Sequence, residues 1–136
     1  MNRTLVECAR TMLKHADLPN SYWAEAVSTA VYIRNRGFTN ALDKHVTPFE
    51  RWYGRKPDVS NFRVFGCIAY AHVADSVRQK LDSKAIKVRF LGDSARSKGY
   101  RLFDEKSKMF LVRRDVIFNK QILCLILASQ QRVVQI

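Results

Sequence analysis

Cysteine, histidine and glycine are scarce in this sequence: its 136 residues include three, three and five of them. Cys8, Cys67 and Cys124 lie far apart and form no Cys-x-x-Cys pair, which argues against a zinc site and against a disulfide framework. We interpret them as small buried apolar residues of a protein in a reducing compartment. Because every glycine stands alone, the sequence lacks a glycine-rich phosphate-binding loop.

Long hydrophobic runs are also missing. No apolar stretch approaches the ~20 residues that a membrane-spanning helix needs. Four charged residues are spread through segment 1–15, which is unlike a secretory signal. We therefore expect an intracellular protein without a membrane partner.

Acidic residues are few and scattered, with 12 Asp and Glu against 24 Lys and Arg. Two-metal phosphoryl chemistry needs several carboxylates within a few ångströms, whereas those in this sequence occupy helix caps, turns and helix faces. Glu7 is the one carboxylate that its basic helix makes a candidate metal ligand, but a lone Glu on an amphipathic helix is usually solvated or salt-bridged. We expect no catalytic residue, no metal site, no cofactor and no small-molecule substrate.

The positive charge is concentrated in the second half of the chain. Residues 1–60 contain nine Lys and Arg against six acidic residues, whereas residues 61–120 contain 14 against six. This asymmetry predicts a polyanionic partner for the second segment. The alternative is a soluble domain whose lysines and arginines are simply solvated.

Apolar residues at spacings of three and four predict two amphipathic helices near the N-terminus. The first covers residues 2–16 and has no clear start signal. The second is expected to be capped by Asn20 or Ser21 and to end near Gly37, where glycine would supply a left-handed closing residue.

The segment Thr47-Pro-Phe-Glu50 predicts a third, short helix over residues 48–53. Thr47 is placed to cap it, proline suits the first helical position, and Glu50 can complete a capping box. Gly54 ends this helix.

Alternation of apolar and basic residues then predicts strands with one buried face and one solvated face. The pattern is clear where Val88 and Phe90 alternate with Lys87 and Arg89. Turn residues divide the segment into five strands, at about 63–73, 86–91, 99–104, 109–113 and 115–119. We therefore predict an α+β protein in which N-terminal helices are followed by a small β-barrel.

The candidate binding residues are cations around and within these strands. They are Arg55, Lys56, Lys84, Lys87, Arg89, Arg96, Lys98, Arg101, Arg113 and Arg114. Their aromatic neighbours are Tyr53, Phe90, Tyr100 and Phe110. Exposed aromatic rings could stack on bases, but we expect these rings mainly to fill the barrel core. The cations would then bind DNA or RNA through the phosphate backbone, with little sequence specificity.

Several short motifs carry a family resemblance. They are MNRTL at 1–5, YWAEA at 22–26, WYGRKP at 52–57, FGC at 65–67 and RDV at 114–116. Over about residues 1–120 the sequence resembles the integrase region of copia-type retrotransposon Pol polyproteins. The resemblance implies the helical end of a ribonuclease-H-like core at 1–57 and an SH3-like barrel at 58–120. The segment 121–136 departs from the family pattern, and we interpret it as a divergent, aggregation-prone tail.

The resemblance also bears on activity. Family integrases use two Asp and one Glu to bind divalent metal, with the Glu in a motif like N-G-x-x-E-R-x-N-R-T-L. Matching that motif to residues 2–5 places the catalytic Glu upstream of Met1, so Glu7, Asp17 and Glu25 receive no catalytic role. The expectation is a catalytically inactive integrase fragment that binds nucleic acid, with a nuclear location implied by the family. Alternatives are a module that docks on an intact integrase or self-associates, and a non-functional transposon remnant.

Overall fold

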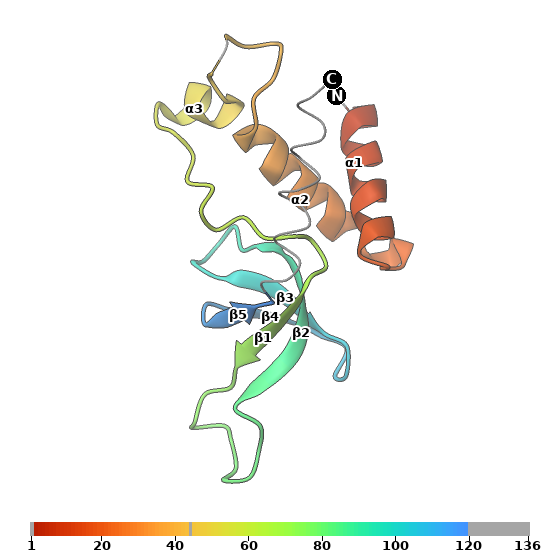
Figure 1. Cartoon of the computed structure of the whole chain (residues 1–136), viewed down its shortest axis with the longest axis vertical. Helices are drawn as coiled ribbons and strands as arrows, with labels where there is room; N and C mark the ends of the chain where they lie inside the picture. Colours follow the sequence, from red (N-terminus) through yellow and green to blue (C-terminus); the bar gives the residue numbers. More distant parts are fainter. Residues whose placement is uncertain (1, 44, 120–136) are drawn as a thin grey trace. The chain divides into compact units, whose positions relative to one another are not determined.

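The computed structural model describes residues 2–43 and 45–119 (Figure 1). The chain divides into two compact units after Phe62, each of which is described by itself. The domain boundary expected at 57/58 falls in the irregular segment between the last helix and the first strand. The predicted divergent tail, 121–136, lies outside the described residues.

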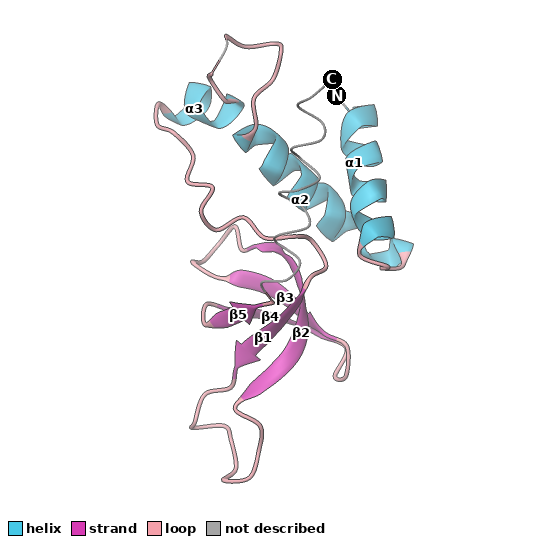
Figure 2. Cartoon of the chain, in the orientation of Figure 1, coloured by secondary structure: helices cyan, strands magenta, loops and turns pink. Residues whose placement is uncertain are grey.

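The first unit is helical and the second consists of strands (Figure 2). The helices are α1 (Asn2–His15), the 3₁₀ helix η1 (Asn20–Tyr22), α2 (Trp23–Arg36) and α3 (Pro48–Tyr53). The strands are β1 (Ile68–His72), β2 (Ala85–Asp93), β3 (Tyr100–Asp104), β4 (Met109–Arg113) and β5 (Val116–Phe118). The predicted order of helices followed by strands is therefore confirmed.

Helices α1 and α2 pack against each other along faces rich in small residues. Ala9 and Leu13 of α1 and Ala26 and Ala30 of α2 are buried. Alanine loses no side-chain entropy in a helix and allows close approach of two helices. The apolar stripes predicted from spacing are therefore buried only in part, because Cys8 of α1 and Trp23 and Val31 of α2, which belong to the same stripes, are exposed.

Both predicted ends of α2 need correction. Asn20 does not cap an α-helix, because Asn20–Tyr22 form a 3₁₀ turn and the α-helix begins at Trp23 without a side-chain cap. The Tyr22 amide donates to the Pro19 carbonyl at 3.1 Å, which forms that turn. Gly37 has φ −95° and ψ 161°, so the closing residue is extended rather than left-handed.

Helix α3 begins and ends where the sequence predicts. The Glu50 amide donates to the Thr47 hydroxyl at 3.1 Å, and Pro48 occupies the first helical position. At the other end Gly54 has φ +69°, and its amide donates to the Glu50 carbonyl at 2.8 Å. Local capping chemistry thus defines a helix of only six residues.

The strands form one antiparallel sheet in the order β4-β3-β2-β1-β5. Among the described strands β4 and β5 are the two edges and do not pair, so the predicted closed barrel is an open sheet. The sheet is nevertheless strongly curved: the rings of Tyr100 on β3 and Phe118 on β5 lie 5.0 Å apart across three strand spacings. β5 has only three residues and, among the described strands, pairs with β1 but not with β4, so the sheet does not close between β4 and β5.

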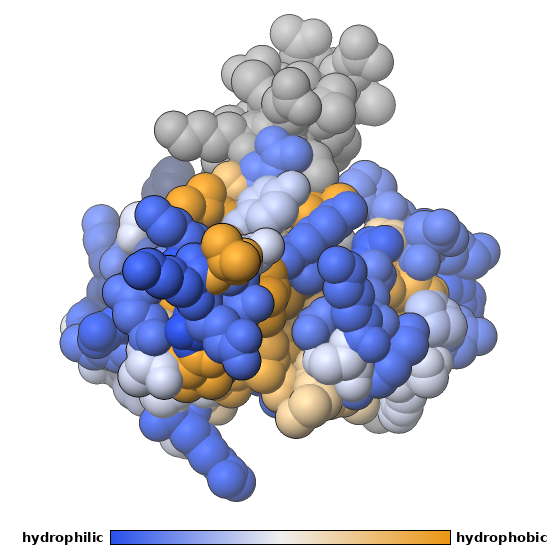
Figure 3. Space-filling model, turned by 90° about the horizontal axis from the view of Figure 1, so that it is seen from below, coloured by the Kyte–Doolittle hydropathy of each residue, from blue (hydrophilic) through white to orange (hydrophobic). Residues whose placement is uncertain are grey.

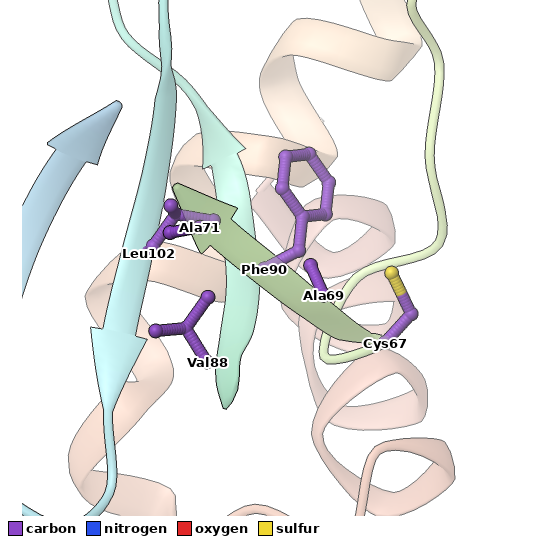
Figure 4. Packing of buried hydrophobic residues seen from close by; sticks show 6 residues of the cluster. All are labelled: Cys67, Ala69, Ala71, Val88, Phe90 and Leu102. Atoms are coloured by element: carbon purple, nitrogen blue, oxygen red, sulfur yellow. The ribbon is translucent and has the colours of Figure 1, made fainter. Parts of the chain in front are cut away.

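The concave face of this sheet carries the hydrophobic core of the second unit (Figure 4). Ala69 of β1 lies opposite Val88 of β2, and Ala71 lies opposite Ile86. Phe90 of β2 lies opposite Leu102 of β3, which is fully buried. The small β1 side chains leave room for the Phe90 ring, which packs edge-on against Phe118 at 5.4 Å. The predicted period-two alternation is confirmed for β1 and for Lys87–Phe90 of β2. It fails beyond Phe90, where Leu91 is also buried, and on β3, where the adjacent Leu102 and Phe103 are both buried.

Cys67 joins the same core and is 7% exposed. Burial raises the pKa of its thiol to about 11, and the nearby charge of Arg63 opposes part of that shift. Cys8, in contrast, is exposed on α1. The expectation of buried cysteines therefore holds for Cys67 and is wrong for Cys8, while Cys124 lies outside the described residues.

Candidate nucleic-acid interface

Strand register defines a second, convex face of the sheet, opposite the core. We call it the outer face. Tyr70 of β1 lies between Lys87 of β2 and Ile117 of β5, and Arg101 of β3 lies opposite Val112 of β4. Its members are Tyr70, Lys87, Arg89, Arg101, Phe103, Phe110, Val112 and Ile117.

Three of the predicted binding cations share the outer face, and they differ in availability. Lys87 is exposed, and within the described residues it has no carboxylate at ion-pair distance. The Arg89 guanidinium pairs with Glu105 and also donates to the Gly66 carbonyl at 3.3 Å. Arg101 is half-buried. Lys87 is thus a mobile point charge, whereas Arg89 is held in place by its partners.

The other predicted cations lie elsewhere. Arg113 pairs with Tyr100 in register and therefore belongs to the core-side face of edge strand β4. Arg96 and Lys98 are exposed in the β2–β3 loop. Lys84 directly precedes β2, and Arg114 lies between β4 and β5. Arg55 and Lys56 follow α3 in the helical unit.

The aromatic residues divide between core and surface. Phe90 and Tyr100 contribute to the core, as predicted. Phe110 and Tyr53 are 55% and 61% exposed, so for them the core prediction is wrong. On β4 it is Leu111 that opposes the buried Leu102, which turns Phe110 outward.

Sequence reasoning did not assign Tyr70, Phe103 or Ile117 to this surface. Phe110 packs on Phe103 at 5.2 Å, and Tyr70 and Ile117 are exposed side by side. Counting alternate positions from the buried alanines of β1 would have found Tyr70. The resulting outer face combines the exposed rings of Tyr70 and Phe110 with cations, whereas Phe103 is buried at 6% exposure. Figure 3 shows, from one side, hydrophilic residues covering most of the surface with hydrophobic residues between them.

Comparisons with known proteins agree with this architecture. Residues 67–126 match the retroviral polymerase SH3-like domain, a range that contains all of β1 to β5 within the described residues. Over 120 residues, 88% of this chain, the sequence is 43% identical to the Nicotiana tabacum protein "Retrovirus-related Pol polyprotein from transposon TNT 1-94". It is 34% identical over 119 residues to the Arabidopsis thaliana "Retrovirus-related Pol polyprotein from transposon RE1".

The chain belongs to the copia-type retrotransposon Pol polyprotein family. It spans 9% of the tobacco polyprotein and 8% of the RE1 polyprotein. An uncharacterized mitochondrial protein of Arabidopsis thaliana is also similar, with 44% identity over 53% of this chain and 59% of that protein. No solved structure matches the chain.

The family resemblance that the short motifs indicated is therefore confirmed. The SH3-like character of the strand-rich unit is confirmed as well. In the part of the chain that the structure describes, His, Cys, Asp and Glu side chains form no group of three suited to holding a metal ion. In that same part no helix has the length and apolar character needed to cross a membrane.

Proposed function

We propose that the SH3-like unit binds nucleic acid through its outer face and through Arg96 and Lys98 of the β2–β3 loop. The observation that carries the proposal is the exposed Lys87, which lies opposite Tyr70 and two residues before Arg89 on one sheet face and has no carboxylate at ion-pair distance among the described residues. The surrounding segment 61–120 has 14 Lys and Arg against six acidic residues. Cations of this kind displace condensed counterions from phosphates, which favours association entropically.

The two kinds of cation on the outer face would serve different purposes. Arg89 is fixed by Glu105 and the Gly66 carbonyl, and the Glu105 carboxylate offsets much of its charge, so Arg89 would act mainly as a positioned hydrogen-bond donor. Lys87 has a flexible stem and can follow a phosphate as the backbone of the nucleic acid varies. Neither geometry reads base edges in a defined register, so backbone contacts would dominate.

A charge-reversal pair tests the location of binding. We expect the double variant Lys87→Glu/Arg101→Glu to weaken duplex binding at least about tenfold at low salt, because two phosphate contacts become repulsive. Fluorescence anisotropy of a labelled duplex titrated with the full chain measures the affinity.

The matched control for this experiment is Lys106→Glu/Lys108→Glu. It changes the net charge equally but alters the exposed β3–β4 turn, and we expect less than about a threefold effect. Equal losses in the two double variants would show that net charge, rather than the outer face, governs binding. Absence of duplex binding by the unaltered chain would reject the proposal altogether.

We also propose that the chain does not join DNA strands by itself. The support is the motif alignment above, which leaves Glu7, Asp17 and Glu25 without counterparts among the catalytic acids of the family. Incubation with a labelled donor duplex and a supercoiled target in Mg²⁺ or Mn²⁺ should give no joined product. Reproducible joining that co-purifies with the chain, and is lost in a Glu7→Gln variant, would contradict this.

A further inference from the structure

The helical unit contains an open pocket where the end of α2 meets α3. Its volume is about 460 Å³, within the range of small-ligand sites. It is lined by Asn35, Arg36, Pro48, Phe49, Trp52 and Tyr53. All of these belong to the first unit, so the pocket exists within that unit alone.

The pocket holds an arginine among aromatic rings. The Arg36 guanidinium carbon lies 3.6 Å from the Tyr32 ring centroid and 4.6 Å from that of Phe49. Its Nη1 also donates to the Tyr32 carbonyl at 3.2 Å. Arg55 approaches the Phe49 ring at 5.6 Å. Both cations thus contact aromatic rings, and in the described part of the chain neither forms an ion pair with a carboxylate.

The rim of the pocket exposes large aromatic surfaces. Trp52 is 83% exposed and Tyr53 61% exposed, although tryptophan is normally well buried. The Tyr53 ring packs against Phe49 at 4.5 Å, which fixes it beside the cations. An indole this exposed contributes little to the core of its own unit, so its surface is available to a ligand.

The charge around the pocket favours an anionic ligand. Segment 32–57 contains six Lys and Arg against two acidic residues, Asp43 and Glu50. A ligand that matches both the planar rings and the cations must combine a flat aromatic ring with negative charge. A nucleotide has both, and every base offers a π-face for stacking.

We propose that this pocket binds an unpaired nucleotide of single-stranded nucleic acid. The base stacks on Trp52 and Tyr53, and the adjacent phosphates approach Arg36 and Arg55. The Asn35 side chain at the pocket wall offers both a donor and an acceptor to a base edge. This site lies on the helical unit and does not depend on the outer face proposed above.

The two tryptophans of the chain make the test direct. In a Trp23→Phe variant the remaining indole is Trp52, and we expect an oligothymidine of about ten nucleotides to quench its fluorescence by stacking. The matched control is Trp52→Phe, which leaves Trp23, itself 57% exposed on α2. Trp23 should show no quenching, and quenching of both tryptophans alike, or of neither, would overturn the proposal.

Affinity provides a second measurement. Truncation by Trp52→Ala should weaken oligothymidine binding by roughly 5- to 150-fold, whereas Trp52→Phe keeps a stacking ring and should lose much less. Circular dichroism verifies that each variant keeps its helices. Equal affinity of Trp52→Ala and the unaltered chain would reject the site.

Two further measurements distinguish nucleotide stacking in the pocket from binding of any acidic polymer and from duplex binding at the outer face. Polyglutamate supplies charge without bases, so if it quenches Trp52 as strongly as oligothymidine does, the ligand is an acidic polymer and the proposal is wrong. Duplex binding tests the outer face independently, because we expect Trp52→Ala to leave it unchanged. Loss of duplex binding in Lys87→Glu/Arg101→Glu with oligothymidine quenching intact would place the two ligands on separate surfaces.

Discussion

Single residues in this molecule acquire their chemistry from burial more than from residue type, as two cysteines illustrate. Cys8 is exposed on α1, whereas Cys67 is packed against the β1–β2 core. The spacing of apolar residues in α1 places Cys8 in the predicted apolar stripe. A cysteine at the edge of such a stripe can face either the core or the solvent. Sequence spacing identified the stripe and did not locate its edge.

The first residue-scale prediction concerns thiol reactivity. We expect iodoacetamide near neutral pH to alkylate Cys8 and to leave Cys67 unmodified in the folded chain, because burial raises the pKa of Cys67 to about 11 and blocks access. Peptide mass spectrometry assigns the modified sites. Modification in denaturant, where both residues should react, is the control, and equal rates under native conditions would contradict the prediction.

The same raised pKa has a consequence for stability against pH. The ordinary thiol pKa is 9.0, so the unfolded chain loses this proton before the folded chain does. The contribution of the neutral thiol is therefore fully present below pH 9.0 and is lost as pH rises toward about 11. Urea unfolding across this window should show a steeper decline than in Cys67→Ala, which lacks the titrating group.

At the scale of elements, signals that act within a few residues predicted structure better than signals that depend on partners. Helix α3 could be predicted because Thr47, Pro48 and Gly54 all act on their own turn. Which face of β4 meets the core could not be predicted in this way, because most residues on both faces of this strand are exposed. The pairing of Leu111 with Leu102 decides it. The left-handed conformation predicted for Gly37 is wrong, because glycine permits that conformation without requiring it.

The two helix-ending glycines give a paired prediction at this scale. Gly54→Ala should destabilise α3 by about 1 kcal/mol, since φ is +69° and an added Cβ would meet nothing within 4 Å, so the cost is conformational. Faster hydrogen exchange of the residue-54 amide measures it. Gly54→Asn should cost less, because asparagine tolerates this conformation.

The control is Gly37→Ala, at φ −95°, where the added Cβ would make an ordinary contact with the Ile33 carbonyl at 3.6 Å. We expect no loss of stability there. If the Gly37 substitution proved as costly as the Gly54 substitution, the assignment of two different backbone conformations would be wrong.

At the scale of the whole molecule, composition predicted where the positive charge lies but not how it is arranged. Segment 61–120 does carry the excess, yet only Lys87, Arg89 and Arg101 of the candidate set share the outer face. A shift in register between Phe90 and Gly92 resets the alternation along β2. Counting alternate positions through such a bulge assigns faces wrongly, and the bulge depends on pairing with β3.

This arrangement sets the character of binding that we expect from the full chain. Because the exposed cations are spread over a sheet face and loops, they should neutralise phosphates without reading bases. About four phosphate contacts would give a slope near −3.6 for the logarithm of duplex affinity against the logarithm of salt concentration, and roughly a 100-fold loss of duplex affinity for a fourfold rise in salt.

Two duplexes of unrelated sequence should show the same slope and affinities within about threefold. Anisotropy titrations over a salt series measure both quantities. A flat salt dependence would remove the electrostatic basis of the proposed function, whereas a strong preference for one sequence would require base contacts that the outer face does not provide.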